Sequence, residues 1–236
     1  MNSILKEILD WSEVWAPLIP LTFLLIYWNK TAYLKPVRIY LIVALLLNLF
    51  TDVLWKLRDY KIIDFAEDDF FYNNNFIYNL GSCVRFFLFA WFFIGLKQRF
   101  MHRIKAILPL AFLVFILINF IFYENFIPQG NREYFSSRLL ATESALLLFY
   151  CLQYFIYLII EEKQGKLSSK PGFFVTMGLS IYMAANFFIF LLWEYLVKQT
   201  KDFALGIWDV HNITFIIFCI FIAIQFNQEH KKVSVS

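Results

Sequence analysis

The sequence predicts an all-α integral membrane protein, built as a seven-transmembrane helix bundle, and two observations lead to this prediction. Hydrophobic residues make up 61% of the 236 residues and charged residues only 17%, whereas soluble domains have about 45–50% and about 25%. The hydrophobic residues also occur in long blocks, and the mean hydropathy is +0.62. A helix needs about 20 apolar residues to cross a bilayer, so the blocks themselves predict the number of spans.

Seven segments have the length and composition of membrane-spanning helices: 14–29, 37–56, 75–96, 104–123, 139–160, 173–197 and 204–226. The first is short and contains Pro17 and Pro20, which kink a helix but are tolerated within membranes. Apolar residues recur at helical spacing from Ile4 to Leu9 and predict a short interfacial helix over residues 1–13. The predicted membrane domain covers 14–228, and residues 229–236 form a cytoplasmic tail.

The distribution of basic residues predicts the orientation of the chain. They are concentrated in alternate connections: Lys30, Lys35 and Arg38; Lys97, Arg99, Arg103 and Lys105; Lys163, Lys166 and Lys170; Lys231 and Lys232. The opposite connections hold fewer basic residues and an acidic run over 64–69. Because cytoplasmic loops are enriched in Lys and Arg, we expect the N-terminus outside the cytoplasm and the C-terminus inside. The short loops, with no Cys in the predicted external ones, favour the cytoplasmic membrane of a bacterium.

A possible internal repeat relates the two halves of the chain. Asn48 precedes Trp55 by seven residues in the second span, and Asn186 precedes Trp193 by seven residues in the sixth. Seven residues are about two helical turns, so each pair shares one helix face. The pattern fits two parallel three-helix units joined by the fourth span, and parallel repeats occur in some transporters. Chance is the alternative, since Asn and Trp are common near membrane interfaces.

Several ionisable residues lie within the predicted spans, although a charge at the bilayer centre costs about 2.5–3.5 kcal/mol on insertion scales. By helical rise they fall in the outer half of the spans, and Arg85 lies deepest, near the midplane. We therefore expect an outward-facing polar pocket with Arg85 as its floor, paired with Asp52 or Glu143, because an unpaired buried charge is unfavourable. The predicted ligand-binding residues are Asn48, Asp52, Asn79, Arg85, Glu143, Asn186, Asp209, His211 and Asn212. The alternative is a set of interhelical hydrogen bonds that only fix the packing.

Other site chemistries have little support in the sequence. Neither a CxxC nor an HExxH motif is present, so no thiol redox site, cysteine zinc site or zinc protease site is predicted. We expect no metal, no cofactor and no enzymatic activity, with a membrane hydrolase or metalloenzyme as the least favoured alternative. The basic residues form no clustered face, which argues against nucleic-acid binding. The 30 Phe residues suit lipid-facing surfaces.

The leading functional prediction is a receptor-like or sensory membrane protein embedded in the lipid bilayer. Its outward pocket binds a small-molecule ligand or responds to pH, with His211 titrating near neutrality. Its basic inner loops engage a membrane or cytoplasmic protein partner. The first alternative is a small-solute transporter of the seven-helix two-repeat type, which requires an inner gate. The second is a scaffold or assembly subunit of a membrane complex, with a purely structural polar core.

Overall fold

The structure is a computed structural model that describes residues 3–26, 31–60, 62, 75–124, 136–161, 166–199 and 201–235. Throughout these residues the chain is helical and contains no strand, which confirms the all-α prediction. The elements in chain order are α1 (Ser3–Asp10), α2 (Ser12–Trp15), α3 (Leu18–Ile26), η1 (Ala32–Leu34), α4 (Lys35–Asp59), α5 (Asn75–Gly95), α6 (His102–Ile118), η2 (Asn119–Tyr123), α7 (Ser137–Glu161), η3 (Leu167–Ser169), α8 (Phe173–Gln199) and α9 (Lys201–Val235).

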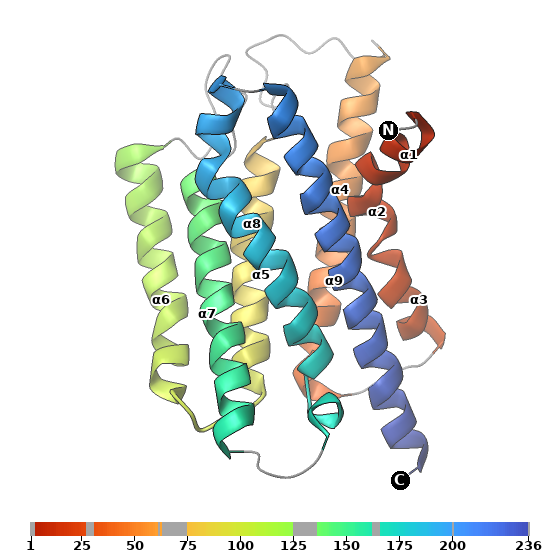
Figure 1. The fold of residues 1–236 in the computed structure, drawn as a ribbon, viewed down its shortest axis with the longest axis vertical. Helices are drawn as coiled ribbons and strands as arrows, with labels where there is room; N and C mark the ends of the chain where they lie inside the picture. Colours follow the sequence, from red (N-terminus) through yellow and green to blue (C-terminus); the bar gives the residue numbers. More distant parts are fainter. Residues whose placement is uncertain are drawn as a thin grey trace.

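Six of these helices are long and apolar enough to cross a membrane, and they alternate in direction through the bundle (Figure 1). Helices α4, α6 and α8 run toward the end drawn at the top, hereafter the upper end, and α5, α7 and α9 run back toward the lower end. They correspond to six of the seven predicted spans. A helix satisfies its own backbone hydrogen bonds, as hydrocarbon requires, so these helices make the chain a multi-pass membrane protein.

The first predicted span, 14–29, is a broken helix in the structure. A turn at Ala16 and Pro17 separates α2 from α3. Helix α3 packs against α9 and α4, and it runs in the same direction as α9 (Figure 1). A straight helix from Ser12 to Ile26 would be about 22 Å long, less than the roughly 30 Å of the hydrocarbon core. The last residues of the predicted span lie outside the described residues, so a seventh crossing stays a prediction.

The chain ahead of this broken helix folds onto the bundle near its upper end. Helix α1 lies within the segment predicted to form an interfacial helix, and it contacts α9 and α2. Leu5 and Ile8 on α1 are exposed. The indole Nε1 of Trp15 donates a hydrogen bond of 2.8 Å to the carbonyl oxygen of Ile8. This bond ties α2 to the helix before it, so α1 and α2 form one small unit.

Helix α9 extends well beyond the predicted end of its span at residue 226 and continues to Val235. It therefore includes nearly all of the segment predicted as a tail. The sequence after Phe226 has neither Gly nor Pro to end the helix, and side chains fix its last turns to η3. Gln228 Nε2 donates to the carbonyl oxygen of Ser168 over 2.6 Å, and Lys232 Nζ donates to that of Ser169 over 3.0 Å.

Helix α6 lies at the edge of the bundle, next to α5 and α7 (Figure 1). In the range His102–Tyr123 the buried side chains are Lys105, Phe112 and Asn119. The remaining surface is apolar and largely exposed, as at Leu110 and Ile121. Such a surface suits contact with lipid on most sides of the helix.

The Phe residues occupy both the core and the lipid-facing surface, so the expectation that they belong on the surface is only half right. Phe122 and Phe188 are exposed, whereas Phe86, Phe89 and Phe218 are completely buried. The rings of Phe89 and Phe218 lie 5.6 Å apart and join α5 to α9. Helix association within lipid depends on van der Waals packing rather than on the hydrophobic effect, and large rings supply many such contacts. Composition alone does not separate the two environments.

Helices α8 and α9 approach each other closely at Gly178. A Cβ atom at this position would lie 2.7 Å from Phe221 Cβ and 3.2 Å from Phe218 Cδ2. Phe221 Cβ is fixed to the backbone of α9, so a side chain at Gly178 would force the two helices apart. Small residues permit such close approach between membrane helices.

We expect the substitution Gly178→Ala to destabilise the protein by about 1–3 kcal/mol, because overpacking at a fixed contact costs this much. The measurement is the melting temperature of the purified protein in detergent. Gly206→Ala is the matched control: a Cβ there has no neighbour within 4 Å, and Ala is favoured over Gly in a helix by about 0.5–1 kcal/mol. A Gly178→Ala protein that melts at or above the wild-type temperature would contradict the close approach.

Candidate functional site

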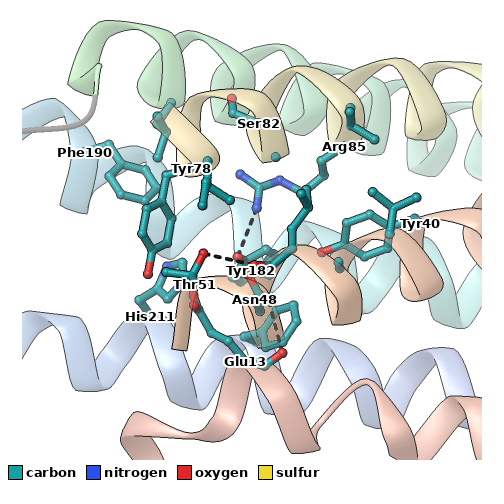
Figure 2. Close-up of a pocket in the computed structure, with 18 residues that line it drawn as sticks. Glu13, Tyr40, Asn48, Thr51, Tyr78, Ser82, Arg85, Tyr182, Phe190 and His211 are labelled. Carbon is teal, nitrogen blue, oxygen red and sulfur yellow. Dashed lines mark hydrogen bonds and ion pairs between the residues drawn. The ribbon is translucent and has the colours of Figure 1, made fainter. Parts of the chain in front are cut away.

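A small polar cavity lies inside the bundle and is lined by residues of α2, α4, α5, α7, α8 and α9 (Figure 2). Its volume is about 50 Å³, and one water molecule needs about 10–15 Å³ of such space, so it holds a few waters. Arg85 from α5 and Glu13 from α2 approach it from opposite sides. The polar residues that line it are Glu13, Tyr40, Asn48, Thr51, Tyr78, Ser82, Arg85, Tyr182 and His211.

On one side of the cavity, an ion pair joins α5 to α7. Arg85 Nε and Nη2 donate to the two carboxylate oxygens of Glu143 over 2.5 and 2.7 Å. Ser82 Oγ donates to the same carboxylate over 2.5 Å; Ser82 and Arg85 are three residues apart and share a face of α5. The Glu143 side chain is completely buried, and that of Arg85 is 12% exposed. Of the two predicted partners for Arg85, Glu143 is therefore the one that pairs with it.

Tyr182 on α8 connects this ion pair to the other side of the cavity. Arg85 Nη1 donates to the Tyr182 hydroxyl over 3.3 Å, and the guanidinium carbon lies 5.6 Å from the centre of the Tyr182 ring. The ring stacks on Phe218 of α9 at 5.6 Å. It also lies 5.4 Å from the ring of His211. Tyr182 thus contacts a member of each charged cluster.

On the other side, His211 on α9 joins α8 to the N-terminal α2. Its Nδ1 lies 2.6 Å from Asn186 Oδ1, and its Nε2 lies 2.8 Å from Glu13 Oε1. The indole ring of Trp208 stacks on the imidazole at 4.7 Å. Asn48 Nδ2 of α4 donates to the backbone carbonyl of Glu13 over 3.1 Å. Glu13 is thereby held by its side chain to α9 and by its backbone to α4.

The structure brings five of the nine predicted site residues together around the cavity. Asn48, Arg85 and His211 line it. Glu143 and Asn186 lie one hydrogen bond behind, on Arg85 and on His211. The other four predicted residues, Asp52, Asn79, Asp209 and Asn212, do not line it.

Asn79 belongs to a separate polar cluster at the upper end of α5, α6 and α7. Its Oδ1 accepts a hydrogen bond of 2.9 Å from the backbone N–H of Ser136. Ser136 Oγ bonds to Glu124 and accepts from the N–H of Leu139 over 3.1 Å, which caps the start of α7. Asn119 Nδ2 donates to Glu124 Oε2 over 2.9 Å. This cluster satisfies free backbone groups at a helix end, so Asn79 has a structural role there.

The remaining three predicted residues lie around the contact of the N-terminal helices with α4 and α9. Asp52 is within electrostatic range of Glu13, Lys56 and Asp10. Partial burial raises the pKa of the Asp10 carboxyl; Lys6 opposes this effect and Asp209 reinforces it. Asn212 is buried, and neither polar atom of its carboxamide has a hydrogen-bond partner among the described residues.

Sequence reasoning missed Glu13 and Tyr182 as site residues. Glu13 lies before the first predicted span and was assigned to the interfacial segment, and its partner His211 is 198 positions away in sequence. Tyr182 carried a usable signal, since it precedes Asn186 by four residues and shares its helix face. Ser82 carried the same kind of signal, three residues before Arg85.

The arrangement suits charge and proton binding better than catalysis or metal binding. The Glu143 carboxylate is occupied by three donors, so it is not available as a general base. Among the described residues, no group of three or more His, Cys, Asp and Glu side chains is placed to hold a metal ion. His211 is the group around the cavity that can carry a proton on one or both of its ring nitrogens.

Comparison of the chain with known proteins finds no matching family model, no matching curated protein and no matching solved structure. The function is therefore argued from the site alone.

We expect Glu143→Gln to destabilise the protein by about 3–5 kcal/mol, because removal of one partner leaves the other charge buried without compensation. The double variant Arg85→Gln/Glu143→Gln should cost less than the sum of the two single variants, as measured by thermal unfolding in detergent. Arg138→Gln serves as a control, because Arg138 is 58% exposed and lies 3.8 Å from Glu124; an exposed pair contributes at most about 1 kcal/mol. Additive effects of the two core substitutions would contradict a coupled pair.

Proposed function

We propose that the protein is a receptor-like or sensory membrane protein whose buried cavity takes up a small ligand or a proton and passes the change to a membrane or cytoplasmic partner. The observation that carries this proposal is the position of the cavity between two charged clusters. The Arg85–Glu143 pair lies on one side, and the His211–Glu13 pair lies on the other. Intramembrane charges are costly and tend to mark functional sites. A change in the cavity would act on the six helices that line it.

The size of the cavity restricts what the proposed receptor takes up in this conformation. At about 50 Å³ it is far below the roughly 300–1,000 Å³ of sites for drug-sized ligands. A proton, an ion or a molecule of a few heavy atoms is therefore favoured. A larger ligand would require the N-terminal helices to move, since Glu13 of α2 forms part of the lining.

We further propose seven crossings, with the upper end outside the cytoplasm and the lower end inside. The path of α2 and α3 beside α4 and α9 supports a seventh crossing, because it carries the chain from the upper part of the bundle toward the lower end (Figure 1). The basic connections near Lys105 and Lys170 lie at the lower end, and the positive-inside rule places such an end in the cytoplasm. The short connections favour the cytoplasmic membrane of a bacterium.

At the lower end of the bundle, side chains of α7 and α9 hydrogen-bond to backbone groups at or just before the starts of α6 and α8 and hold this end closed. Tyr150 Oη donates to the carbonyl oxygen of Lys105 over 2.7 Å, and Tyr154 Oη donates to that of Pro171 over 2.9 Å. Gln225 Oε1 accepts from the N–H of Phe174 over 3.0 Å. A receptor can keep this end closed while it signals through the shape of its inner surface, whereas a transporter must open it. The closed end favours the receptor.

A small-solute transporter remains the alternative, and the arrangement of the helices is the observation in its favour. Helices α3, α4 and α5 alternate in the same directions as α7, α8 and α9 (Figure 1). Helix α6 joins the two sets in the chain and lies at the outer edge of the bundle. This is the plan expected for two parallel three-helix repeats with one joining helix. Asn48 and Asn186, the paired residues of the sequence pattern, contact Glu13 and its partner His211. Uptake into proteoliposomes would distinguish transport from sensing.

The variant Gly81→Val tests whether the cavity is the binding site. Gly81 lines the cavity, and a Cβ there meets a single neighbour, Leu47 Cδ1, at 3.9 Å, so a valine fills space without a clash. We expect a solute that raises the melting temperature of the wild type to leave that of Gly81→Val unchanged, because a ligand stabilises only a protein that binds it. The probes are free amino acids, small carboxylic acids, ammonium, alkali-metal cations and buffers of about pH 5 to 8.

Gly206→Val is the matched control, since the same substitution there faces empty space, and it should respond as the wild type does. A shift that persists in Gly81→Val would mean that binding occurs elsewhere. If no condition shifts the wild type, the cavity does not act as a receptor site, and the scaffold or assembly role replaces the receptor.

A further inference from the structure

Both ring nitrogens of His211 face oxygen acceptors. Asn186 Oδ1 lies 2.6 Å from Nδ1, and Glu13 Oε1 lies 2.8 Å from Nε2. A neutral imidazole has one N–H and can donate to only one of these oxygens, whereas an imidazolium donates to both. A His211 ring with a proton on each nitrogen would satisfy both oxygens in this arrangement.

The same side chains have a second arrangement that suits a neutral His211. Asn186 Nδ2 is buried and has no hydrogen-bond partner among the described residues. Rotation of the carboxamide by half a turn would place this NH2 group against Nδ1 and remove the oxygen from it. The imidazole would then accept from Asn186 and donate its single proton to Glu13. The two arrangements differ by one proton and one amide rotation.

One carboxylate and one aromatic face lie next to the His211 ring. Arg85 is neutralised by Glu143 on the far side of the cavity, so the Glu13 carboxylate is the near charge. The ring of Trp208, stacked at 4.7 Å and 19°, presents an aromatic face that attracts a cation. The ionisable groups on the elements packed around His211 are Asp10 of α1, Glu13 of α2, Asp52, Lys56 and Tyr40 of α4, Tyr78 and Arg85 of α5, Tyr182 of α8 and Asp209 of α9.

We infer that a proton is the ligand of this site, and that protonated His211 latches α2 onto α9 through Glu13. This inference rests on the proposed receptor function and names what the receptor takes up. With His211 charged, the contact is an ion pair with a charge-assisted hydrogen bond, which is roughly twice as strong as a neutral one. Deprotonation leaves a neutral donor against a carboxylate, so the hold on α2 weakens as the pH rises.

The N-terminal helix α2 is short, and Glu13 provides its polar contacts with the bundle. Helix α2 has four residues, and turns at Trp11 and at Ala16–Pro17 flank it. Besides the latch, Asn48 Nδ2 donates to the Glu13 carbonyl, and the Tyr78 hydroxyl of α5 hydrogen-bonds the Glu13 carboxylate. Loss of the His211 ion pair would therefore loosen α2 from α9, with Glu13 still held to α4 and α5, and open the cavity toward the upper end.

A cysteine in α2 reports directly on this latch. Ser12 is completely buried in α2, and Ser12→Cys changes one atom. The full chain in nanodiscs is treated with a water-soluble maleimide at pH values from about 5 to 8. Gly206→Cys, at an exposed position, gives the reference rate and removes the intrinsic pH dependence of a thiol. The wild type, with its three native cysteines, gives the background.

We expect the ratio of the Ser12→Cys rate to the Gly206→Cys rate to rise about tenfold between the acidic and the alkaline limit, as a hydrogen bond loses its charge. With His211→Gln the ratio should be high and independent of pH. Glu13→Gln, a smaller change that retains a hydrogen-bond acceptor, should give the same flat profile if His211→Gln fails to fold.

Two outcomes would overturn the latch. One is a labelling ratio that does not change with pH when His211 and Glu13 are intact, and the other is a pH dependence that persists in both His211→Gln and Glu13→Gln. These outcomes are separable from failure of the receptor itself. If the labelling ratio does not change with pH, but a solute raises the melting temperature of the wild type and not that of Gly81→Val, the protein is a receptor whose ligand is not a proton. A pH-dependent ratio without any solute shift retains the proton as the ligand.

Discussion

The interaction on which the rest of the structure depends is the pairing of the fully buried Glu143 carboxylate with Arg85 and Ser82. No water is available within hydrocarbon to solvate an ion, so this carboxylate must find its donors inside the bundle. Arg85 and Ser82 supply three of them from one face of α5. That requirement fixes the rotation of α5 against α7, and it turns Arg85 toward Tyr182 of α8. The cavity exists because polar groups gather at this point while aromatic rings fill the layers around it.

The sequence predicts the long helices well because hydrophobic length is a local property. Six of the seven predicted spans are long helices in the structure, and α9 exceeds its prediction because no Gly or Pro follows Phe226. The pairing of Arg85 was also open to prediction, since a charge near the midplane needs a partner and the chain offers few. What the sequence does not contain is the rotation of each helix about its own axis. Without the rotation of each helix, Asn79 and Asn48 are equally good candidates for the pocket. In the structure Asn79 bonds to Ser136 at the start of α7, whereas Asn48 reaches Glu13 at the cavity.

The contact of the N-terminal segment with α9 was not predicted, and the reason is physical. Residues 1–13 are amphipathic and acidic, which is typical of a segment at the membrane surface. Glu13 instead reaches His211, a contact that joins residues 198 positions apart. Periodicity reports on the faces of a single helix and contains nothing about such distant pairs. The acidic character that marked the segment as interfacial is also what lets it complement a histidine.

The two charged clusters differ in a way that separates structural from switching roles. Around Glu143 each donor has its acceptor, and the guanidinium stays charged at any physiological pH, so this cluster has one state. The His211 ring can carry a proton on one or both nitrogens, and the buried Asn186 amide has a hydrogen-bonding group to offer to each of these forms. A bistable element is what a sensor needs. Tyr182 lies between the two clusters, against Arg85 and against the His211 ring. A movement of the His211 ring would therefore reach Arg85 and Glu143 through Tyr182.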